Sequence, residues 1–213
     1  MKHIILDLDN TIYPVSSIGD KLFEPLFRLL ANPEFQLSAS AIQKARQQIM
    51  RIPFQKVARE FEFPDQLTES ALALLRNLTY NEKMTYFDGY PLVRELDTIK
   101  FLLTTGFQKL QESKVRSLGI GEDFTEIFII DPDRSKMTKK DVMIRIMEKY
   151  SLKPGDLLVI GDDPESEIKA GNELDIETYL LDPEELYLDT TATYRGKTLA
   201  EVLNYIQQSG SRE

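Results

Sequence analysis

The chain of 213 residues contains no cysteine, no tryptophan and only one histidine. The absence of cysteine excludes disulfide-stapled folds, thiol nucleophiles and thiolate-bound zinc or iron–sulfur clusters. A single histidine argues against histidine-rich metal sites and against Ser-His-Asp catalysis. Any catalysis must therefore rest on carboxylates, hydroxyls, lysines and a hard metal ion.

Charge and hydropathy restrict the partners of the protein. The 35 acidic and 26 basic residues give a net charge of −9, which argues against nucleic-acid binding because protein surfaces that bind nucleic acids are normally basic. The apolar runs are only a few residues long, so we expect no membrane span. Charged residues follow the first residues too soon for a signal peptide. We therefore expect a cytoplasmic protein, and its oligomeric state stays open.

Five short apolar segments predict β-strands, and helical patterns separate the last four of them. This alternation predicts an α/β fold with a doubly wound parallel sheet. A capping box from Thr138 to Asp141 marks the start of one helix. Asp163 is placed to cap another, with Gly171 just past its end, and Thr198 to cap the last. The predicted strands are residues 3–8, 99–103, 126–130, 157–160 and 176–181.

A long helical block separates the first strand from the second. Apolar residues recur at helical spacing through residues 20–80, and four prolines divide this region into short helices. The block is too long to be a simple crossover connection. We therefore predict an α/β core of residues 1–13 and 86–213, with a separate helical module of residues 14–85 inserted into it.

Polar residues follow four of the predicted strands. Ligands of doubly wound sheets bind beyond the carboxyl ends of the strands, so these residues are expected to meet at one edge of the sheet. Each motif alone is more typical of a turn or a helix cap; their occurrence in order at four strand ends is what indicates a site. In chain order they are Asp7, Asp9 and Thr11, then Thr104 and Thr105, then Asp131, Arg134 and Lys136, and last Asp162 and Asp163.

The residue types at this edge predict phosphate chemistry. Asp7 and Asp9 are two residues apart, so their side chains point the same way from an extended chain. Carboxylates gathered at one place repel each other and need a cation, and oxygen ligands without histidine or cysteine favour Mg²⁺. A hydroxyl and a lysine beside that cation can neutralise a phosphoryl group. A carboxylate can then act as a nucleophile and form an aspartyl-phosphate.

Together these motifs resemble the haloacid dehalogenase superfamily of phosphohydrolases with a helical cap. The DxDxT motif of that family matches Asp7-Leu8-Asp9-Asn10-Thr11. Its hydrophobic strand ending in threonine matches residues 101–104, and its lysine before a helix is best matched by Lys136. Its acidic Gly-Asp signature matches residues 161–171.

The resemblance implies a role for each motif. Asp7 is the nucleophile, and Asp9 protonates the leaving group and then activates water. The resemblance also implies Mg²⁺ bound by the Asp7 carboxylate, the Asp9 backbone carbonyl and Asp162. Thr104, with its neighbour Thr105, and Lys136 hold the phosphoryl oxygens. The acid at the second motif position favours phosphate chemistry over dehalogenation.

Three questions remain open at this stage: which lysine binds the phosphate, what Asp163 and Glu167 do, and which reaction is catalysed. Lys139 or Lys140 can replace Lys136 as the phosphate-binding lysine. Asp163 or Glu167 can act beside the metal ligands or among them. The expected reaction is hydrolysis of a small phosphate ester, such as a nucleoside monophosphate or a sugar phosphate, with residues 14–85 as the cap that closes over it. A mutase acting on a sugar phosphate, and a weakly catalytic binding protein, are the alternatives.

Overall fold

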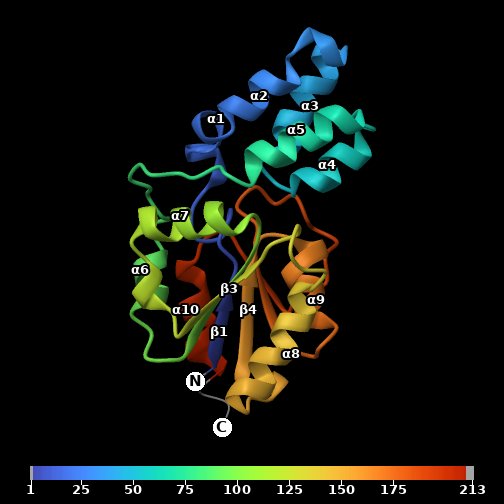
Figure 1. Cartoon of the computed structure of the whole chain (residues 1–213). Coiled ribbons are helices and arrows are strands. Elements are labelled where there is room, and N and C mark those ends of the chain that lie inside the picture. Colours follow the sequence, from blue (N-terminus) through green and yellow to red (C-terminus); the bar gives the residue numbers. More distant parts are fainter. Residues whose placement is uncertain (1, 210–213) are drawn as a thin grey trace.

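The computed structural model describes residues 2–209 and contains a six-stranded, fully parallel sheet (Figure 1). The strand order is β3-β2-β1-β4-β5-β6, with β1 at the centre, and this confirms the predicted α/β fold. Such a sheet needs helices on both faces to bury it. The strands are β1 (His3–Leu6), β2 (Lys100–Thr105), β3 (Glu126–Ile130), β4 (Leu157–Gly161), β5 (Glu177–Leu181) and β6 (Tyr194–Gly196).

Helices cover both faces of the sheet (Figure 1). Because side chains alternate along a strand, Ile4 and Leu6 belong to one hydrophobic cluster while Ile5 belongs to another. The first cluster also contains residues of α7 and α10, and the second contains residues of α8 and α9. The helices of the core are α6 (Tyr90–Arg94), α7 (Gln108–Leu118), α8 (Lys139–Tyr150), α9 (Lys169–Asn172) and α10 (Ala200–Ser209).

The helices within residues 15–75, which follow β1, form a unit beyond the carboxyl end of the sheet (Figure 1). Leu26 and Leu30 of this helical unit, which comprises residues 15–75, share one buried cluster with Leu102 and Leu158 of the sheet. The unit is therefore anchored on the core by apolar packing. Its elements are a 3₁₀ turn (Val15–Ser17), α1 (Gly19–Leu22), α2 (Glu24–Leu30), a second 3₁₀ turn (Pro33–Phe35), α3 (Ala39–Ile49), α4 (Phe54–Glu60) and α5 (Asp65–Leu75). The domain boundaries at residues 14 and 85 stay a prediction.

Three local features differ from the prediction. The edge strand β6 was not expected, because three residues carry too short a pattern. Helix α6, which is only five residues long, was not predicted either. Gly171 lies within α9 and not beyond it, because the segment after Asp163 starts with a π-helical turn (Pro164–Ile168) that displaces the helix along the chain. Two further 3₁₀ turns are Gly121–Asp123 and Pro154–Asp156.

The predicted start of α8 is confirmed. The capping box that opens α8 is present: the Asp141 backbone N–H donates to Thr138 Oγ1 (3.2 Å), and the Thr138 N–H donates to Asp141 Oδ2 (2.7 Å). Among residues 2–209, no helix has the length and apolar character needed to cross a bilayer.

Candidate active site

The chain turns sharply just after β1, and this turn places the first pair of carboxylates. The Asp7 backbone N–H still donates to the Ile160 carbonyl (3.0 Å), so Asp7 continues the line of the strand. Asn10 then adopts a left-handed conformation (φ 56°), which asparagine tolerates better than most residues. Its Oδ1 accepts the Val15 N–H (3.1 Å), and its Nδ2 donates to the Met50 carbonyl (3.4 Å). Asn10 thus joins the catalytic turn to the helical unit.

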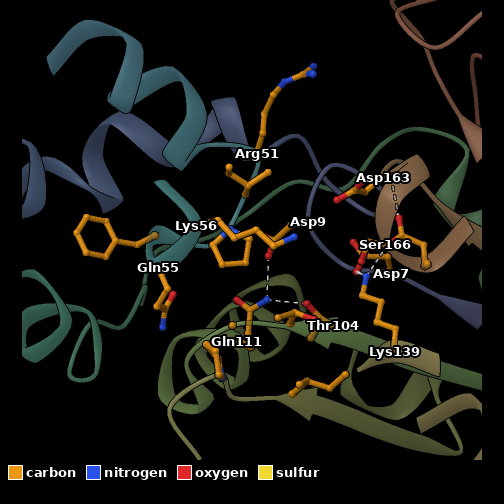
Figure 2. A pocket seen from close by; sticks show the side chains of 18 of the residues that line it. Asp7, Asp9, Arg51, Gln55, Lys56, Thr104, Gln111, Lys139, Asp163 and Ser166 are labelled. Carbon is orange, nitrogen blue, oxygen red and sulfur yellow. Dashed lines mark hydrogen bonds and ion pairs between the residues drawn. The ribbon is translucent and has the colours of Figure 1, made fainter. Parts of the chain in front are cut away.

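Asp7 lies in a cluster with two other carboxylates, Glu167, which is buried as Asp7 is, and Asp162, which is half-buried. One oxygen from each of the three lies within 4.8 Å of the others. Lys139, from the first turn of α8, donates to Asp7 Oδ1 (2.5 Å) and to Glu167 Oε2 (2.6 Å), as Figure 2 shows for Asp7. One lysine therefore neutralises only part of the charge of three carboxylates.

Burial and mutual repulsion shift the titration of this cluster. Burial, with the Glu167 and Asp9 charges, raises the pKa of Asp7 to about 7 despite Lys139. Burial and the charges of Glu167 and Asp7 raise the pKa of Asp162 to about 9. Burial alone would lower the pKa of Lys139, but Asp7 and Glu167 hold it above its usual value. A cation placed among these oxygens would therefore relieve an unfavourable charge.

This cluster fits the magnesium ion that the fold implies. All three side chains offer hard carboxylate oxygens, and the described residues contribute no histidine or cysteine to the group. The side chains of Asp7 and Asp162 from the predicted metal set are present, and Glu167 joins them. The side chain of Asp9 lies elsewhere, and the role of its backbone carbonyl stays a prediction.

Glycine at the end of β4 makes room for Glu167. A Cβ atom built at Gly161 would lie 2.1 Å from Glu167 Oε1 and 2.2 Å from its Cγ. The same Oε1 accepts the Asp163 backbone N–H (2.8 Å). The π-helical turn after Asp163 thus places the Glu167 side chain against Gly161, at the end of β4. The Gly-Asp signature is therefore a packing requirement as well as a source of carboxylates.

Asp9 has its own set of partners, separate from the carboxylate cluster. Lys114 Nζ donates to its Oδ1 (2.7 Å), Gln111 Nε2 donates to its Oδ2 (2.8 Å), and the Tyr13 hydroxyl donates to Oδ1 in a short hydrogen bond. Burial alone would raise the pKa of Asp9, but Lys114 and these hydrogen bonds hold it below its usual value. Asp9 is therefore a charged carboxylate in this conformation.

The predicted phosphate-binding residues, Thr104, Thr105 and Lys136, differ in burial. Thr104 is buried, and its Oγ1 accepts a hydrogen bond from Gln111 Nε2 (2.7 Å). Thr105 and Lys136 both line the cavity described below, and Lys136 is exposed. Lys139, which the sequence left as an alternative, is the lysine that contacts Asp7. It occupies the first helical position after the Thr138 cap.

A cavity of about 720 Å³ lies between the helical unit and the carboxyl edge of the sheet. Asp7, Asp9 and Lys139 line its floor, and apolar residues including Phe54 and Leu110 line its walls. Figure 2 shows Gln55 reaching into the space between the two units, whereas Arg51 points away. Other residues of the wall are Val15, Phe23, Ile49, Met50, Leu75 and Phe107.

Two arginines of the helical unit, Arg46 and Arg51, contact other residues of the protein. The Arg51 guanidinium donates to the Tyr187 hydroxyl (3.3 Å), which ties the helical unit to the loop after β5. Arg46 lies over the Phe27 ring and pairs with Asp20 (3.4 Å). Both arginines therefore have partners within the protein.

Sequence reasoning missed Gln111 and Lys114. Both lie on the buried face of α7 together with Leu110 and Leu118. Polar residues at positions of an amphipathic helix that should be apolar are a usable signal, because burying them without partners is costly. Asp131, by contrast, has a structural role: its Oδ2 accepts the Gln108 N–H at the start of α7 (3.1 Å).

A parallel α/β sheet with a carboxylate cluster and a lysine at its carboxyl edge, covered by a helical insertion, defines a class of hydrolases. The model of one family, haloacid dehalogenase-like hydrolase, matches residues 1–175 of this chain. The chain belongs to that family, and it is an enzyme of the hydrolase class. The resemblance inferred from the motifs is thereby confirmed.

Individual relatives are distant in sequence and similar in fold. A glyceraldehyde 3-phosphate phosphatase of Methanopyrus kandleri is 22% identical over 186 residues, which cover 81% of this chain and 80% of the relative. A haloacid dehalogenase-like family hydrolase of Streptococcus pneumoniae has a TM-score of 0.72 at 20% identity, covering 97% of this chain and 99% of that one. YfnB of Bacillus subtilis, solved with bound magnesium, has a TM-score of 0.67 at 16% identity, covering 96% and 98%.

Proposed function

We propose that this hydrolase is a Mg²⁺-dependent phosphatase that cleaves a small phosphate monoester through an aspartyl-phosphate at Asp7. The observation that carries the proposal is the buried contact of Asp7 with Lys139 beside two further carboxylates, at the floor of a cavity that also contains Asp9. This arrangement supplies a nucleophile, a positive charge, metal ligands and an acid–base group within one enclosure.

In the first step, a carboxylate oxygen of Asp7 attacks phosphorus, and the bond from phosphorus to the ester oxygen breaks. The departing oxygen takes the electron pair of that bond and a proton from Asp9. Because Asp9 is charged beside Lys114 in the resting conformation, it must take up this proton from solvent as the substrate binds. Lys139 and Thr104 hold the oxygens of the transferred phosphoryl group.

In the second step, a water oxygen attacks phosphorus and the bond to Asp7 breaks, which returns the electron pair to the Asp7 carboxylate. Asp9 accepts the proton of the attacking water. The charged state of Asp9 in the structure suits this second step directly.

Asp7, Asp162 and Glu167 are the side chains that would hold Mg²⁺. The bound ion supplies positive charge that offsets the negative charge developing on the phosphoryl oxygens. Lys139 would keep Asp7 and Glu167 oriented during turnover, because it contacts both carboxylates. The helical unit would act as the cap that excludes water other than the attacking molecule.

The cavity favours a small metabolite as the substrate. Its volume of about 720 Å³ lies within the roughly 300–1,000 Å³ typical of small-molecule sites. The distant relative named for glyceraldehyde 3-phosphate supports a phosphorylated metabolite of this kind. Sugar phosphates and nucleoside monophosphates therefore form the first substrate panel.

The test is a phosphate-release screen over that panel with Mg²⁺ or with EDTA. We expect turnover that requires the metal and that Asp7→Asn abolishes, while Asp88→Asn, which alters an exposed carboxylate, keeps normal turnover. Phosphorus NMR identifies the product, because an isomer formed without free phosphate would mean a mutase. Undiminished turnover by Asp7→Asn would refute the assignment of the nucleophile.

A further inference from the structure

Two side chains of α7 fix both oxygens of the Asp9 carboxylate. Lys114 contacts Oδ1 and Gln111 contacts Oδ2, at 2.7 and 2.8 Å. The Lys114 side chain is only 4% exposed, and Gln111 is 1% exposed. A second hydrogen bond from Gln111 to Thr104 (2.7 Å) ties this pair to the end of β2. Figure 2 shows Gln111 between Asp9 and Thr104.

Packing alone does not account for these two residues. They are three positions apart on α7, so they lie on the same face of the helix as Leu110 and Leu118, which are buried apolar residues. A lysine is rarely buried unless its ammonium is paired. Asp9 is the partner that the structure gives to the Lys114 ammonium, and both residues line the cavity. The α7 face is therefore built around Asp9.

We propose that Lys114 and Gln111 are positioning residues that hold the Asp9 carboxylate in the orientation in which it accepts a proton during the second step of the reaction. This inference rests on the proposed function. An ionised carboxylate has about four lone-pair sites, and Lys114, Gln111 and Tyr13 occupy three of them. One site is left to accept the proton of the attacking water.

Each residue has a defined part in that step. The water oxygen forms a bond to phosphorus while the bond to Asp7 breaks, and the released proton passes to the free lone pair of Asp9. Lys114 keeps its hydrogen bond to Asp9 and transfers no proton in this step. Gln111 fixes the rotation of the carboxylate and holds Thr104 at the same time. Without these contacts the carboxylate rotates, and water activation is lost.

The test uses p-nitrophenyl phosphate, whose p-nitrophenolate product leaves without protonation. The first step therefore proceeds without help from Asp9, and only the second step depends on it. In Lys114→Met we expect a rapid burst of p-nitrophenol that approaches one equivalent of enzyme. Steady-state turnover should then be slower than wild type by about 10- to 100-fold, a conservative share of the effect of a general base.

Three further variants separate positioning from a structural role. Lys114→Arg restores a cation and should recover much of the steady-state rate with p-nitrophenyl phosphate. Gln111→Met removes the other contact and should give the same pattern more weakly. Arg116→Met, at an exposed position of the same helix, should match wild type. Glycerol 3-phosphate releases an alkoxide that needs a proton from Asp9, so its first step also depends on the position of Asp9. With this substrate, Lys114→Met should show no burst of glycerol.

Two results with p-nitrophenyl phosphate would overturn the inference. The first is a burst rate in Lys114→Met that falls as much as its steady-state rate. The second is a steady-state rate in Lys114→Met that equals that of the wild type. If circular dichroism shows that Lys114→Met does not fold, Lys114→Arg and Gln111→Met decide the question by the same burst measurement. Asp7→Asn tests the proposed function separately: a burst that survives in Asp7→Asn refutes the nucleophile, whatever Lys114 does.

Discussion

Gly161→Ala is the perturbation whose effect follows most directly from the structure. The new methyl carbon would lie 2.1 Å from Glu167 Oε1, 2.2 Å from Cγ and 2.5 Å from Cδ. Contacts of about 3.0 Å or less essentially never occur for real Cβ atoms, so the Glu167 carboxylate must move. The move breaks its hydrogen bonds with Lys139 Nζ (2.6 Å) and the Asp163 N–H (2.8 Å).

The cost can be set from these contacts. Overpacking a well-packed site costs about 1–3 kcal/mol, and breaking a buried ion pair costs about 3–5 kcal/mol. The two effects share the same displacement, so we expect a combined loss of about 3–5 kcal/mol. At roughly 2–4 °C per kcal/mol for a chain of this size, the melting temperature should fall by about 6–20 °C.

Urea unfolding followed by circular dichroism measures this loss, with Gly155→Ala as the matched control. Nothing lies within 4 Å of a Cβ atom built at Gly155, so this control should unfold with nearly wild-type stability. Phosphatase activity should fall in Gly161→Ala alone, because Glu167 no longer orients Lys139. A Gly161→Ala protein within about 1 kcal/mol of the control would refute the packing argument.

Other outcomes follow from the same contacts. The pKa values of Asp7 and Asp162 are raised to about 7 and about 9, so Mg²⁺ must displace protons from these carboxyl groups near neutral pH. The Mg²⁺ affinity should therefore rise from pH 6 to pH 9, and calorimetry in buffers of different ionisation enthalpy should detect the released protons. A pH-independent affinity would contradict this expectation. Lys139→Met should lower the free energy of unfolding by about 3–5 kcal/mol and abolish turnover. Lys136→Met should change the free energy of unfolding by no more than about 0.5 kcal/mol. Equal losses of turnover in the two variants would show that both lysines take part in catalysis. Neither the side-chain amide nitrogen nor the oxygen of Gln55 has a hydrogen-bond partner within residues 2–209. Gln55→Leu should therefore raise the free energy of unfolding measured in urea by about 1 kcal/mol. A loss of stability would show that the Gln55 amide has a hydrogen-bond partner.

Sequence reasoning located the strands well because their signal is local. The segment 126–130 was predicted at its observed bounds, and β4 and β5 differ from prediction by one residue. Strand β6 was missed because Tyr194–Gly196 has no period to detect and is fixed by pairing with β5. The π-helical turn before α9 was missed because its geometry depends on Glu167 folding back under Gly161.

The candidate site was predictable where it follows strand ends. Asp7, Asp9, Thr104 and Asp162 occupy the positions that parallel-sheet topology implies. The lysine that contacts Asp7 could not be predicted from order along the chain. Lys139 occupies the first position of α8 and reaches Asp7, and this contact depends on how α8 packs beside β1. Which lysine binds the phosphoryl group stays a prediction.

The most direct test of the account is acid quench of a single turnover, followed by mass spectrometry of the peptide that contains Asp7. The account predicts a phosphoryl group on Asp7 in the wild type, and more of it in Lys114→Met, where the second step is slow. A phosphoryl group on another residue, or none at all in an enzyme that releases phosphate, would contradict the assignment of Asp7 as the nucleophile.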